Sequence, residues 1–287
     1  MKKVLIYSPN PLDGVSYYRQ WGPMSALHSE VQCVQFPMKY EEYSHWTWYL
    51  NYDVCLFSRP HRPNDVVFAE QCKKYGLPLW VDYDDALLHI TDDNPVYTTF
   101  CSTESRRCIS EILKLANVVS VCSKLQKTWL EEKMGLRNVV HIPNALDDRF
   151  LRHAKPFKMS KKIAWRGSDS HVNDLLFFKD EIKAVMEKTP RHQWLYFGVN
   201  PYFLKPETKN WAWAKPMNLT DFVIEFCKFN PSFVFVPLID NFFNRVKSHL
   251  AWFDATLAGA VCMGPAFEEW VDIRIWDYQA DDFQNSF

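Results

Sequence analysis

Short apolar runs alternate with helical segments along almost the whole chain, and this alternation constrains the fold more than any other feature. In the first half we expect strands at 4–8, 31–36, 52–58, 77–81, 118–122 and 139–142. Helices are expected between them, at 15–27, 64–75, 104–116 and 124–134. Strands that alternate with helices favour a parallel sheet with both faces covered, and runs such as VVSV at 118–121 suit strands buried on both sides.

The alternation stops in a polar, basic stretch at 148–162 and then starts again. Strands are expected at 163–165, 194–197, 233–237 and 260–263, and helices at 173–188, 220–229 and 246–258. We therefore predict an α/β protein with two doubly wound, Rossmann-like domains, at 1–153 and 154–275, followed by a tail at 276–287. In such domains ligands bind at the carboxyl ends of the strands.

The composition agrees with two folded domains. The chain has 287 residues, of which 47% are hydrophobic and 23% are charged, so there is material for two cores. A net charge of −1 argues against a protein that is basic throughout, although it leaves room for a local basic patch. The aromatic share of 16% is high and fits either bulky core packing or a groove that binds sugars or bases.

Eight cysteines are scattered without any C-x-x-C pair, and several lie inside apolar runs. This pattern is typical of small buried residues in a reducing compartment, not of a disulfide framework or a zinc site. No apolar run approaches the length of a transmembrane helix, and no signal peptide precedes the first strand. We therefore expect a cytoplasmic protein without a transmembrane segment.

The second domain gathers polar residues where two of its strands end. The strand at 233–237 is followed by Asn244, Lys247 and Ser248, and then by a helix that carries Asp254. Free backbone N–H groups and the helix dipole favour an anion at such a helix start. The strand at 163–165 leads directly into Arg166, and the residues after it, Gly167 and Ser168, precede a helix that Ser168 is a candidate to cap.

The first domain offers polar loops after its first and third strands. Gly14 lies near a helix start and permits close approach of a ligand, and Tyr17 and Tyr18 follow it. Arg59 and His61 lie in a stiff loop between prolines. His61 is a candidate general base or phosphate ligand, or else a surface histidine.

Three carboxylates, Asp82, Asp84 and Asp85, crowd the end of the fourth strand. They can cap a helix, bind a divalent metal or bind the hydroxyl groups of an acceptor. Asp82 and Asp84 have the Asp-x-Asp spacing of a metal site, but they belong to the first domain, away from the anion-binding loops of the second. We therefore favour acceptor binding or capping over metal binding.

Taken in order, these segments resemble a known family. The run Pro237-Leu238, the Asn-x-x-Lys-Ser motif at 244–248, the acid at 254 and Gly259 resemble the donor site of retaining glycosyltransferases with the GT-B fold. That large family includes bacterial mannosyltransferases and sucrose synthases. Pro143-Asn144 matches the turn that closes the family's first domain. The chain departs from the pattern at Val246, where the family has a glutamate, at Asp254, where it also has glutamate, and at Ala145, where glycine is usual.

The resemblance implies a GT-B fold and transfer of a hexosyl or pentosyl group from a nucleoside-diphosphate sugar, with retention of configuration. Arg166 and Lys247 would hold the leaving diphosphate, so that neither a metal nor another cofactor is needed. The donor residues would further include Gly14, Gly167, Ser168, Asn244 and Ser248, with Asp254 on the ribose. His61 would join Arg166 and Lys247 as a catalytic residue. The acceptor side would be formed by Tyr17, Tyr18, Arg59, Asp82, Asp84 and Asp85.

The acceptor is suggested by the basic stretch between the domains. Arg149, Arg152, Lys155 and Lys158 form either a solvated linker or a strip that binds phosphates of nucleic acid. Compact bacteriophage glycosyltransferases that modify hydroxymethylated pyrimidines in DNA are similar in size, so such DNA is the acceptor that we expect. The alternatives are a glycan, a lipid-linked sugar or a small molecule as acceptor, a non-catalytic module that binds a nucleotide or sugar, and an epimerase of related fold.

Overall fold

A computed structural model describes residues 1–8, 13–35, 50–204, 209–271 and 276–278. Contacts divide the chain into two compact units. The first comprises Met1–Ile90 and Tyr97–Asn144, and the second comprises Thr91–Val96 and Ala145–Phe287. The division falls at Asn144, whereas the sequence placed the boundary at 153–154. The 3-10 helix Asp148–His153 contacts two helices of the second unit, which explains why the stretch after Asn144 groups with that unit.

The first unit is built on a six-stranded parallel sheet in the order β2-β1-β3-β4-β5-β6. Its strands are β1 (Lys2–Tyr7), β2 (Val31–Gln35), β3 (Val54–Ser58), β4 (Leu79–Asp82), β5 (Val118–Val121) and β6 (Val139–His141). Its helices are α1 (Gly14–Ser16), α2 (Gly22–Ala26), α3 (Pro63–Lys74), α4 (Tyr97–Cys101), α5 (Thr103–Leu115) and α6 (Lys124–Met134). All six strands predicted for this half are present. The predicted helix at 15–27 is interrupted by a π-helical turn, Tyr17–Trp21, and α4 was not predicted.

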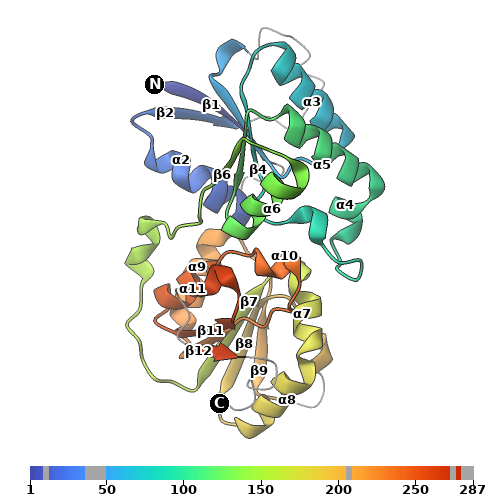
Figure 1. Ribbon diagram of the computed structural model, residues 1–287. Coiled ribbons are helices and arrows are strands. Elements are labelled where there is room, and N and C mark those ends of the chain that lie inside the picture. Colours follow the sequence, from blue (N-terminus) through green and yellow to red (C-terminus); the bar gives the residue numbers. More distant parts are fainter. Residues whose placement is uncertain (9–12, 36–49, 205–208, 272–275, 279–287) are drawn as a thin grey trace. The chain divides into compact units, whose positions relative to one another are not determined.

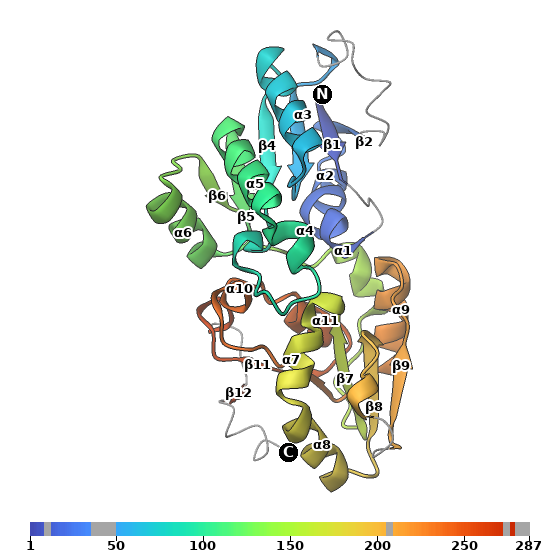
Figure 2. The same ribbon diagram turned by 90° about the vertical axis from the view of Figure 1, so that its right-hand side faces the viewer.

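The helices cover the sheet because each turns an apolar stripe toward it. In α5 the buried residues Cys108, Ile109, Ile112 and Leu113 recur with helical spacing. Figures 1 and 2 show α3 and α5 side by side on one side of the sheet, with α2 on the other. The apolar parts of the central strands, Val4–Tyr7 of β1 and Cys55–Phe57 of β3, are buried, as their sequences predict.

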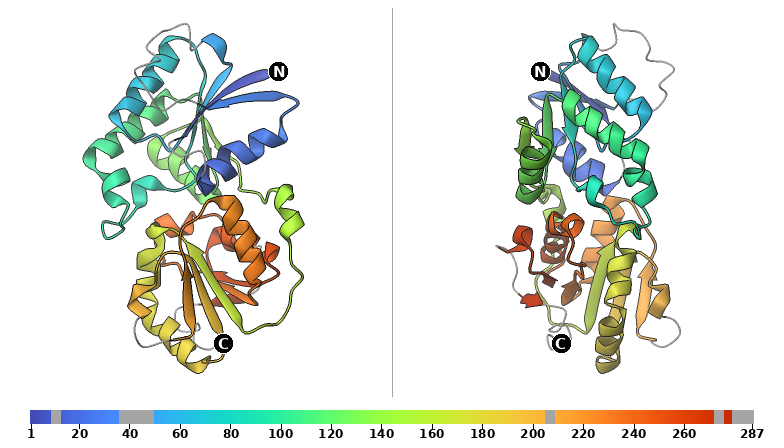
Figure 3. Two further views of the ribbon diagram at one scale, coloured as in Figure 1. Left: turned by 180° about the vertical axis from the view of Figure 1, so that it is seen from behind. Right: turned by 45° about the vertical axis from the view of Figure 1, so that its right-hand side comes forward.

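The second unit is also a six-stranded parallel sheet, in the order β12-β11-β10-β7-β8-β9. Its strands are β7 (Lys162–Gly167), β8 (Gln193–Gly198), β9 (Trp211–Ala214), β10 (Phe233–Phe235), β11 (Val261–Pro265) and β12 (Trp276–Tyr278). Its helices are α7 (Val172–Phe177), α8 (Lys179–Lys188), α9 (Leu219–Phe229), α10 (Phe242–Arg245) and α11 (Leu250–Leu257). Figure 3 and Figure 1 show α7 and α8 on one face of this sheet and α9 and α11 on the other.

Two predicted helices of the second unit differ from the structure. The segment predicted as one helix at 173–188 is two helices that meet at Phe178. The helix predicted at 246–258 is wrong at its start, because α10 precedes it and α11 begins only at Leu250. The side chain of Asn241 caps α10 by accepting from Asn244 N at 2.9 Å, and Trp270 Nε1 donates to Lys247 O at 3.2 Å. The first contact starts α10, and the second engages the carbonyl of Lys247 between the two helices.

Two edge strands were not predicted. In β9 the alternation Trp-Ala-Trp-Ala was a usable signal for a half-exposed strand. The strand β12 lies in the segment predicted as a tail at 276–287, of which residues 279–287 are outside the described part.

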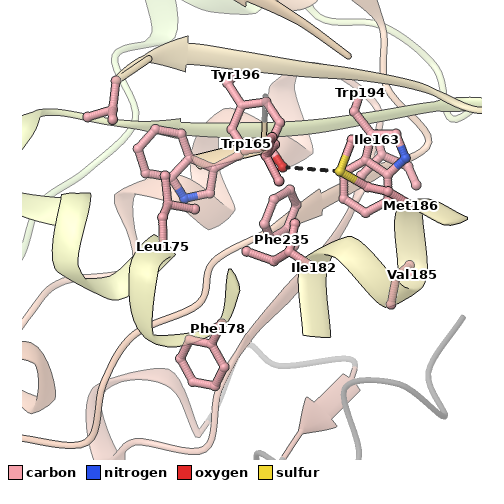
Figure 4. Packing of buried hydrophobic residues seen from close by; sticks show 12 residues of the cluster. Ile163, Trp165, Leu175, Phe178, Ile182, Val185, Met186, Trp194, Tyr196 and Phe235 are labelled. Carbon is pink, nitrogen blue, oxygen red and sulfur yellow. Dashed lines mark hydrogen bonds between the residues drawn. The ribbon is translucent and has the colours of Figure 1, made fainter. Parts of the chain in front are cut away.

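Bulky side chains fill the core of the second unit. Trp165 and Tyr196 come from neighbouring strands, and Trp194 and Phe235 pack with their ring centroids 5.5 Å apart. Figure 4 shows Ile182 and Met186 of α8 pointing into this cluster. The high aromatic content is therefore used at least partly for core packing, one of the two uses expected from the sequence.

Candidate functional site

Each sheet has a point at which its strand order reverses. In the second unit β7 is followed by β8 on one side, and the chain later returns to place β10 on the other side. Read from β9, this is the strand order of a Rossmann fold, in which ligands bind beside the reversal at the carboxyl ends of the strands. In the first unit the reversal lies between β1 and β3. The predicted residues Arg166 and Gly167 end β7, and Arg59 directly follows β3, so both groups lie at these points.

Arg166 is held by a buried acid. Its Nε donates to Oδ2 of Asp254 at 2.7 Å, and its NH2 group contacts the same oxygen. The side chain of Asp254 is 1% exposed and that of Arg166 is 23% exposed, so the carboxylate anchors a guanidinium that still reaches solvent. The guanidinium also lies 5.7 Å from the ring centroid of Phe222. The role of Asp254 on a ribose stays a prediction, and in this structure its carboxylate is engaged by Arg166.

Asp174 of α7 ties together the two loops at the reversal point. Its Oδ1 accepts from the backbone N–H of Ile239 at 2.9 Å and from Nδ2 of Asn244 at 2.8 Å. Its Oδ2 contacts Nδ1 of His171 at 2.9 Å. Asp174 and Asn244 are both buried. Since α7 follows β7 and the segment at 239–244, a turn that runs into α10, follows β10, this one carboxylate fixes that segment against the chain that leaves Arg166.

Lys247 and Ser248 lie between α10 and α11. The ammonium of Lys247 is 4.2 Å from the ring centroid of Phe243, and its backbone carbonyl accepts from Trp270. The helix α11 begins two residues after Ser248, and the side chain of its N-cap residue, His249, makes no capping hydrogen bond. The first N–H groups of a helix attract anions, so the predicted grouping of cation, hydroxyl and helix start is present here.

The backbones of β7 and β8 approach each other closely at their last residues. Gly167 pairs with Gly198 in the sheet register. Gly198 has φ +100°, and a Cβ there would lie 2.1 Å from the carbonyl oxygen of Gly167. A Cβ at Gly167 would meet the indole of Trp165 at 2.6 Å. Ser168 occupies the N-cap position of the 3-10 helix Asp169–His171, as the sequence suggested, but its hydroxyl contacts Ser170 and makes no capping hydrogen bond.

In the first unit Asp82 belongs to a buried ion pair. Arg19 of the π-helical turn donates to both carboxylate oxygens of Asp82, from Nε at 3.0 Å and from NH2 at 2.7 Å. Its NH1 donates to Ile142 O at 2.6 Å and to Asn144 Oδ1 at 3.0 Å. Burial alone would lower the pKa of Arg19, but the hydrogen bonds and charge of Asp82 outweigh it and raise the pKa. This network ties α1–α2 to the ends of β4 and β6.

Asp84 and Asp85 are paired with Arg59. The NH2 group of Arg59 donates to Asp84 Oδ2 and to Asp85 Oδ2, each at 2.6 Å. Arg59 has φ +45°, an uncommon conformation for a residue with a side chain. Among the residues that the structure describes, no group of three histidine, cysteine, aspartate or glutamate side chains is arranged to hold a metal.

His61 is buried and is not a surface histidine. Its Nδ1 is 2.8 Å from the carbonyl oxygen of Arg59, which can only accept, so the proton is on Nδ1 and Nε2 is an acceptor. Nε2 in turn lies 3.4 Å from Nε of Arg62. Burial lowers the pKa of His61, although the bond to Arg59 opposes the shift. A neutral ring with a basic Nε2 is the state required of a general base, and that role stays a prediction.

The remaining predicted residues of the first unit lie near the end of β1. Gly14 starts α1, and a Cβ there would meet no atom within 4 Å. Tyr18 is buried and packs edge-on against the half-buried Tyr17, with centroids 6.0 Å apart. The residues 9–12 of the same loop are outside the described part.

The predicted strip Arg149, Arg152, Lys155 and Lys158 belongs to the second unit and is exposed. Arg149 forms an ion pair with Asp147 at 2.5 Å. Lys155 is fixed through its backbone, because its N–H donates to Leu257 O at 2.9 Å.

Two residues important to these arrangements, Asp174 and Gly198, were not predicted as site residues. The usable signals were the position of Gly198 at a strand end and the single acid of α7, Asp174, which two leucines follow. From the sequence, Arg19 was expected to face a ligand cleft together with Tyr17 and Tyr18, and the structure gives it a buried ion pair with Asp82.

All eight cysteines are free, and seven of them are buried, as their apolar surroundings predict. Within the part of the chain that the structure describes, no helix is both long and apolar enough to cross a membrane.

The sequence matches no protein-family model and no curated protein. Solved structures are similar in fold. HepE from Anabaena, in complex with UDP and glucose, has a TM-score of 0.60 at 12% identity, covering 100% of this chain and 89% of that protein. The catalytic domain of starch synthase IV from Arabidopsis thaliana, bound to ADP and acarbose, has a TM-score of 0.59 at 8% identity, covering 95% and 84%. A glycosyltransferase from Rickettsia africae has a TM-score of 0.57 at 9% identity, covering 99% and 86%.

At these identities the similarity shows the fold. It agrees with the two parallel sheets and with the Rossmann strand order of the second unit. The predicted fold class is confirmed: this chain has the two-domain, Rossmann-like GT-B fold.

Proposed function

We propose that the protein is a glycosyltransferase that moves a sugar from a nucleoside-diphosphate donor to a hydroxyl group. The observation that carries this proposal is the placement of Arg166 at the strand-order reversal of the second unit, anchored there by the buried Asp254. The start of α11 close after Lys247 and Ser248 supports it. The structural neighbours add support, because two of those named above hold UDP or ADP.

The proposed chemistry uses fixed cations. The bond between the anomeric carbon and the phosphate oxygen breaks, and its electron pair stays on the leaving diphosphate. Arg166 and Lys247 stabilise this developing negative charge without a metal ion. The acceptor oxygen bonds to the anomeric carbon, and its proton passes to the leaving phosphate oxygen on the same face. This route retains the configuration and requires no protein nucleophile.

Anchoring of the guanidinium matters for this chemistry. A charge held in place by Asp254 costs no reorganisation when the leaving group develops its charge. Asp174 contributes in the same way, since it fixes the loop that carries Asn244. In this proposal Asn244, Ser248, Gly167 and Ser168 contact the donor.

The experiment is a panel of nucleoside-diphosphate sugars, with release of the nucleoside diphosphate as the readout. Slow hydrolysis without acceptor, and faster release with one, is the expected result. Tight binding of a nucleotide with no turnover under any acceptor would instead support the non-catalytic module. Conversion of one nucleotide sugar into its epimer would support the epimerase.

For the acceptor we carry forward the prediction from the sequence, a hydroxymethylated pyrimidine in DNA. It rests on the exposed cations of the strip at 149–158. Transfer to hydroxymethylated DNA, with none to unmodified DNA, is the expected outcome, because cytosine and thymine offer no suitable hydroxyl. Transfer to a glycan, a lipid-linked sugar or a small molecule alone would refute the DNA acceptor and leave the donor proposal intact.

A further inference from the structure

A short segment from the first half of the chain belongs to the second unit. Thr91–Val96 groups with that unit, although Ile90 and Tyr97, which flank it, group with the first. The segment forms a turn in which the N–H of Asn94 donates to Thr91 O at 3.0 Å. We name Thr91–Val96 the inserted turn.

The side chain of Asn94 lies at the centre of this turn. Asn94 is 7% exposed, whereas the two aspartates before it are exposed. Its Oδ1 accepts from the N–H of Val96 at 3.1 Å, and its Nδ2 donates to Ser170 O at 2.9 Å. The amide is therefore engaged at both ends, because the oxygen shapes the turn and the nitrogen attaches it to the chain that follows β7.

A second hydrogen bond joins the same two segments. Nδ2 of Asn173, at the start of α7, donates to Asp93 O at 2.7 Å. The two bonds attach the inserted turn to the 3-10 helix Asp169–His171 and to the first turn of α7. Each segment supplies one side-chain amide and one backbone carbonyl, so the attachment is reciprocal.

The loop that receives the bond from Asn94 has few other restraints. Ser168 is exposed, and its hydroxyl contacts that of Ser170 in the same loop. The N–H of His171 donates to Ser168 O at 3.0 Å, again within the loop. Among the described residues, the bond from Asn94 is the only hydrogen bond that joins residues 168–170 to a segment distant in sequence. The position of this loop therefore depends on a residue from the first half of the chain.

This loop is part of the proposed donor site. It follows Arg166 and Gly167 at the end of β7, and it carries Ser168. In the proposed function Gly167 and Ser168 contact the donor, and a loop that is already ordered loses less conformational freedom when the donor binds. A residue that holds the loop should therefore strengthen donor binding without itself contacting the donor.

We propose that Asn94 is a positioning residue for the donor site, and that it acts by holding the loop 168–171 in place. The effect on donor binding rests on the proposed function, because it requires a donor bound beside that loop. The restraint on the loop does not, since Asn94 holds it whether or not a donor is bound. The restraint and its effect on binding can therefore be tested separately.

Two variants separate the roles of the amide. Asn94→Asp keeps an oxygen for the N–H of Val96 but loses the N–H that reaches Ser170, whereas Asn94→Ala loses both. Asp92→Asn, at an exposed position of the same turn, is the control. The first measurement is hydrogen exchange of the backbone amides of the full chain without ligand. Exchange at residues 168–171 should become about tenfold faster in both Asn94 variants and stay unchanged in the control.

The second measurement is calorimetric binding of UDP and of ADP, together with turnover of the best donor of the panel. In both Asn94 variants the Kd for the nucleoside diphosphate and the KM for the donor should rise on the order of tenfold, while kcat changes by less than about threefold. This split is expected because the hydrogen bonds of Asn94 reach neither Arg166 nor Lys247. Thermal unfolding shows whether all variants are folded.

Several results would overturn the proposal. They are unchanged loop exchange or unchanged donor binding in both Asn94 variants, a loss that Asp92→Asn shares, and a loss confined to one Asn94 variant. Loss in Asn94→Ala alone would assign the residue to the shape of its own turn, and loss in Asn94→Asp alone would show an effect of the added charge. If the unchanged protein neither binds nor turns over any nucleotide, the proposed function fails and the positioning role fails with it, whereas the exchange experiment still decides whether Asn94 holds the loop.

Discussion

Arg166 and Asp254, which are far apart in the sequence, are joined by a hydrogen bond of 2.7 Å from Nε to Oδ2. The acid is almost completely buried, whereas the base is partly exposed. A buried carboxylate that fixes a solvent-reaching guanidinium creates a cation of defined position at the end of β7. This relationship makes the proposed diphosphate site specific enough to test.

Removal of either proposed cation should reduce sugar transfer while the protein remains folded. We expect Arg166→Ala and Lys247→Ala each to lower kcat/KM on the order of a hundredfold, because a preorganised charge is lost. Arg191→Ala, at an exposed position of the same unit, is the control and should change little. Steady-state kinetics with the best donor of the panel provide the measurement. Near-normal turnover in either variant would remove that residue from the site.

Asp174→Ala should affect both stability and donor binding. It leaves the N–H of Ile239 without its acceptor and the amide of Asn244 with only the carbonyl oxygen of Ile239, which costs about 1–3 kcal/mol in the free energy of unfolding. The loop at 239–244 is then no longer fixed, so KM for the donor should rise. Asp174→Asn keeps an acceptor oxygen and should lose less of both. Urea unfolding and donor kinetics measure the two effects, with the exposed Asp180→Ala as control; equal behaviour of the three variants would contradict the role given to Asp174.

Activity should survive a chelator. Asp82 is paired with Arg19, and Asp84 and Asp85 with Arg59, so these acids already have cationic partners. Turnover measured before and after treatment with EDTA should be the same within a factor of about two. A complete loss that manganese or magnesium restores would show that the Asp-x-Asp sequence is a metal site after all.

The stability of the fold should fall as the solution becomes acidic. Burial lowers the pKa of His61, His89 and His249. Below the ordinary histidine pKa of about 6.5, the unfolded chain takes up protons that the folded chain does not, so the free energy of unfolding decreases as pH falls through that value. Urea unfolding at about pH 7.5 and about pH 5.5 tests this. His61→Gln should reduce the pH dependence, whereas the exposed His28→Gln should leave it unchanged; a stability that rises toward low pH would contradict the prediction.

Two glycines with positive φ should respond differently to substitution by alanine. Gly76 has φ +72° and open space around a new Cβ, so Gly76→Ala costs about 1–2 kcal/mol of backbone strain. Gly198→Ala places a Cβ 2.1 Å from the carbonyl oxygen of Gly167, and it should cost clearly more, at least about 3 kcal/mol. Comparison of the two unfolding free energies decides the matter. Similar losses would mean that the ends of β7 and β8 can move apart.

The sequence by itself determined the class of fold and the places where chemistry can occur. Continuous apolar runs and helical periodicity depend on local residues, so the strands of both sheets, apart from the edge strands β9 and β12, were predictable. The segment at 246–249 was not, because the sequence does not show that the carbonyl of Lys247 bonds to the distant Trp270 instead of continuing an apparently helical pattern. Loops after buried strands were also predictable, and Arg166, Lys247 and Arg59 do lie in or beside such loops.

Only the tertiary structure decided which partners these charges have. Asp254 was predicted to hold a ribose, and Asp82 to face an acceptor. A position at a strand end or on a helix shows where a side chain lies along the chain, but it does not show which side chain of a distant segment contacts it. Arg166 meets Asp254, Arg19 meets Asp82, and Asp174 meets Asn244 only because the sheet order brings distant segments together. From the sequence alone, a charged residue at a strand end could pair with any of several residues of opposite charge. In the fold a buried charge without a partner is costly, so the residue that the fold brings next to it becomes its partner.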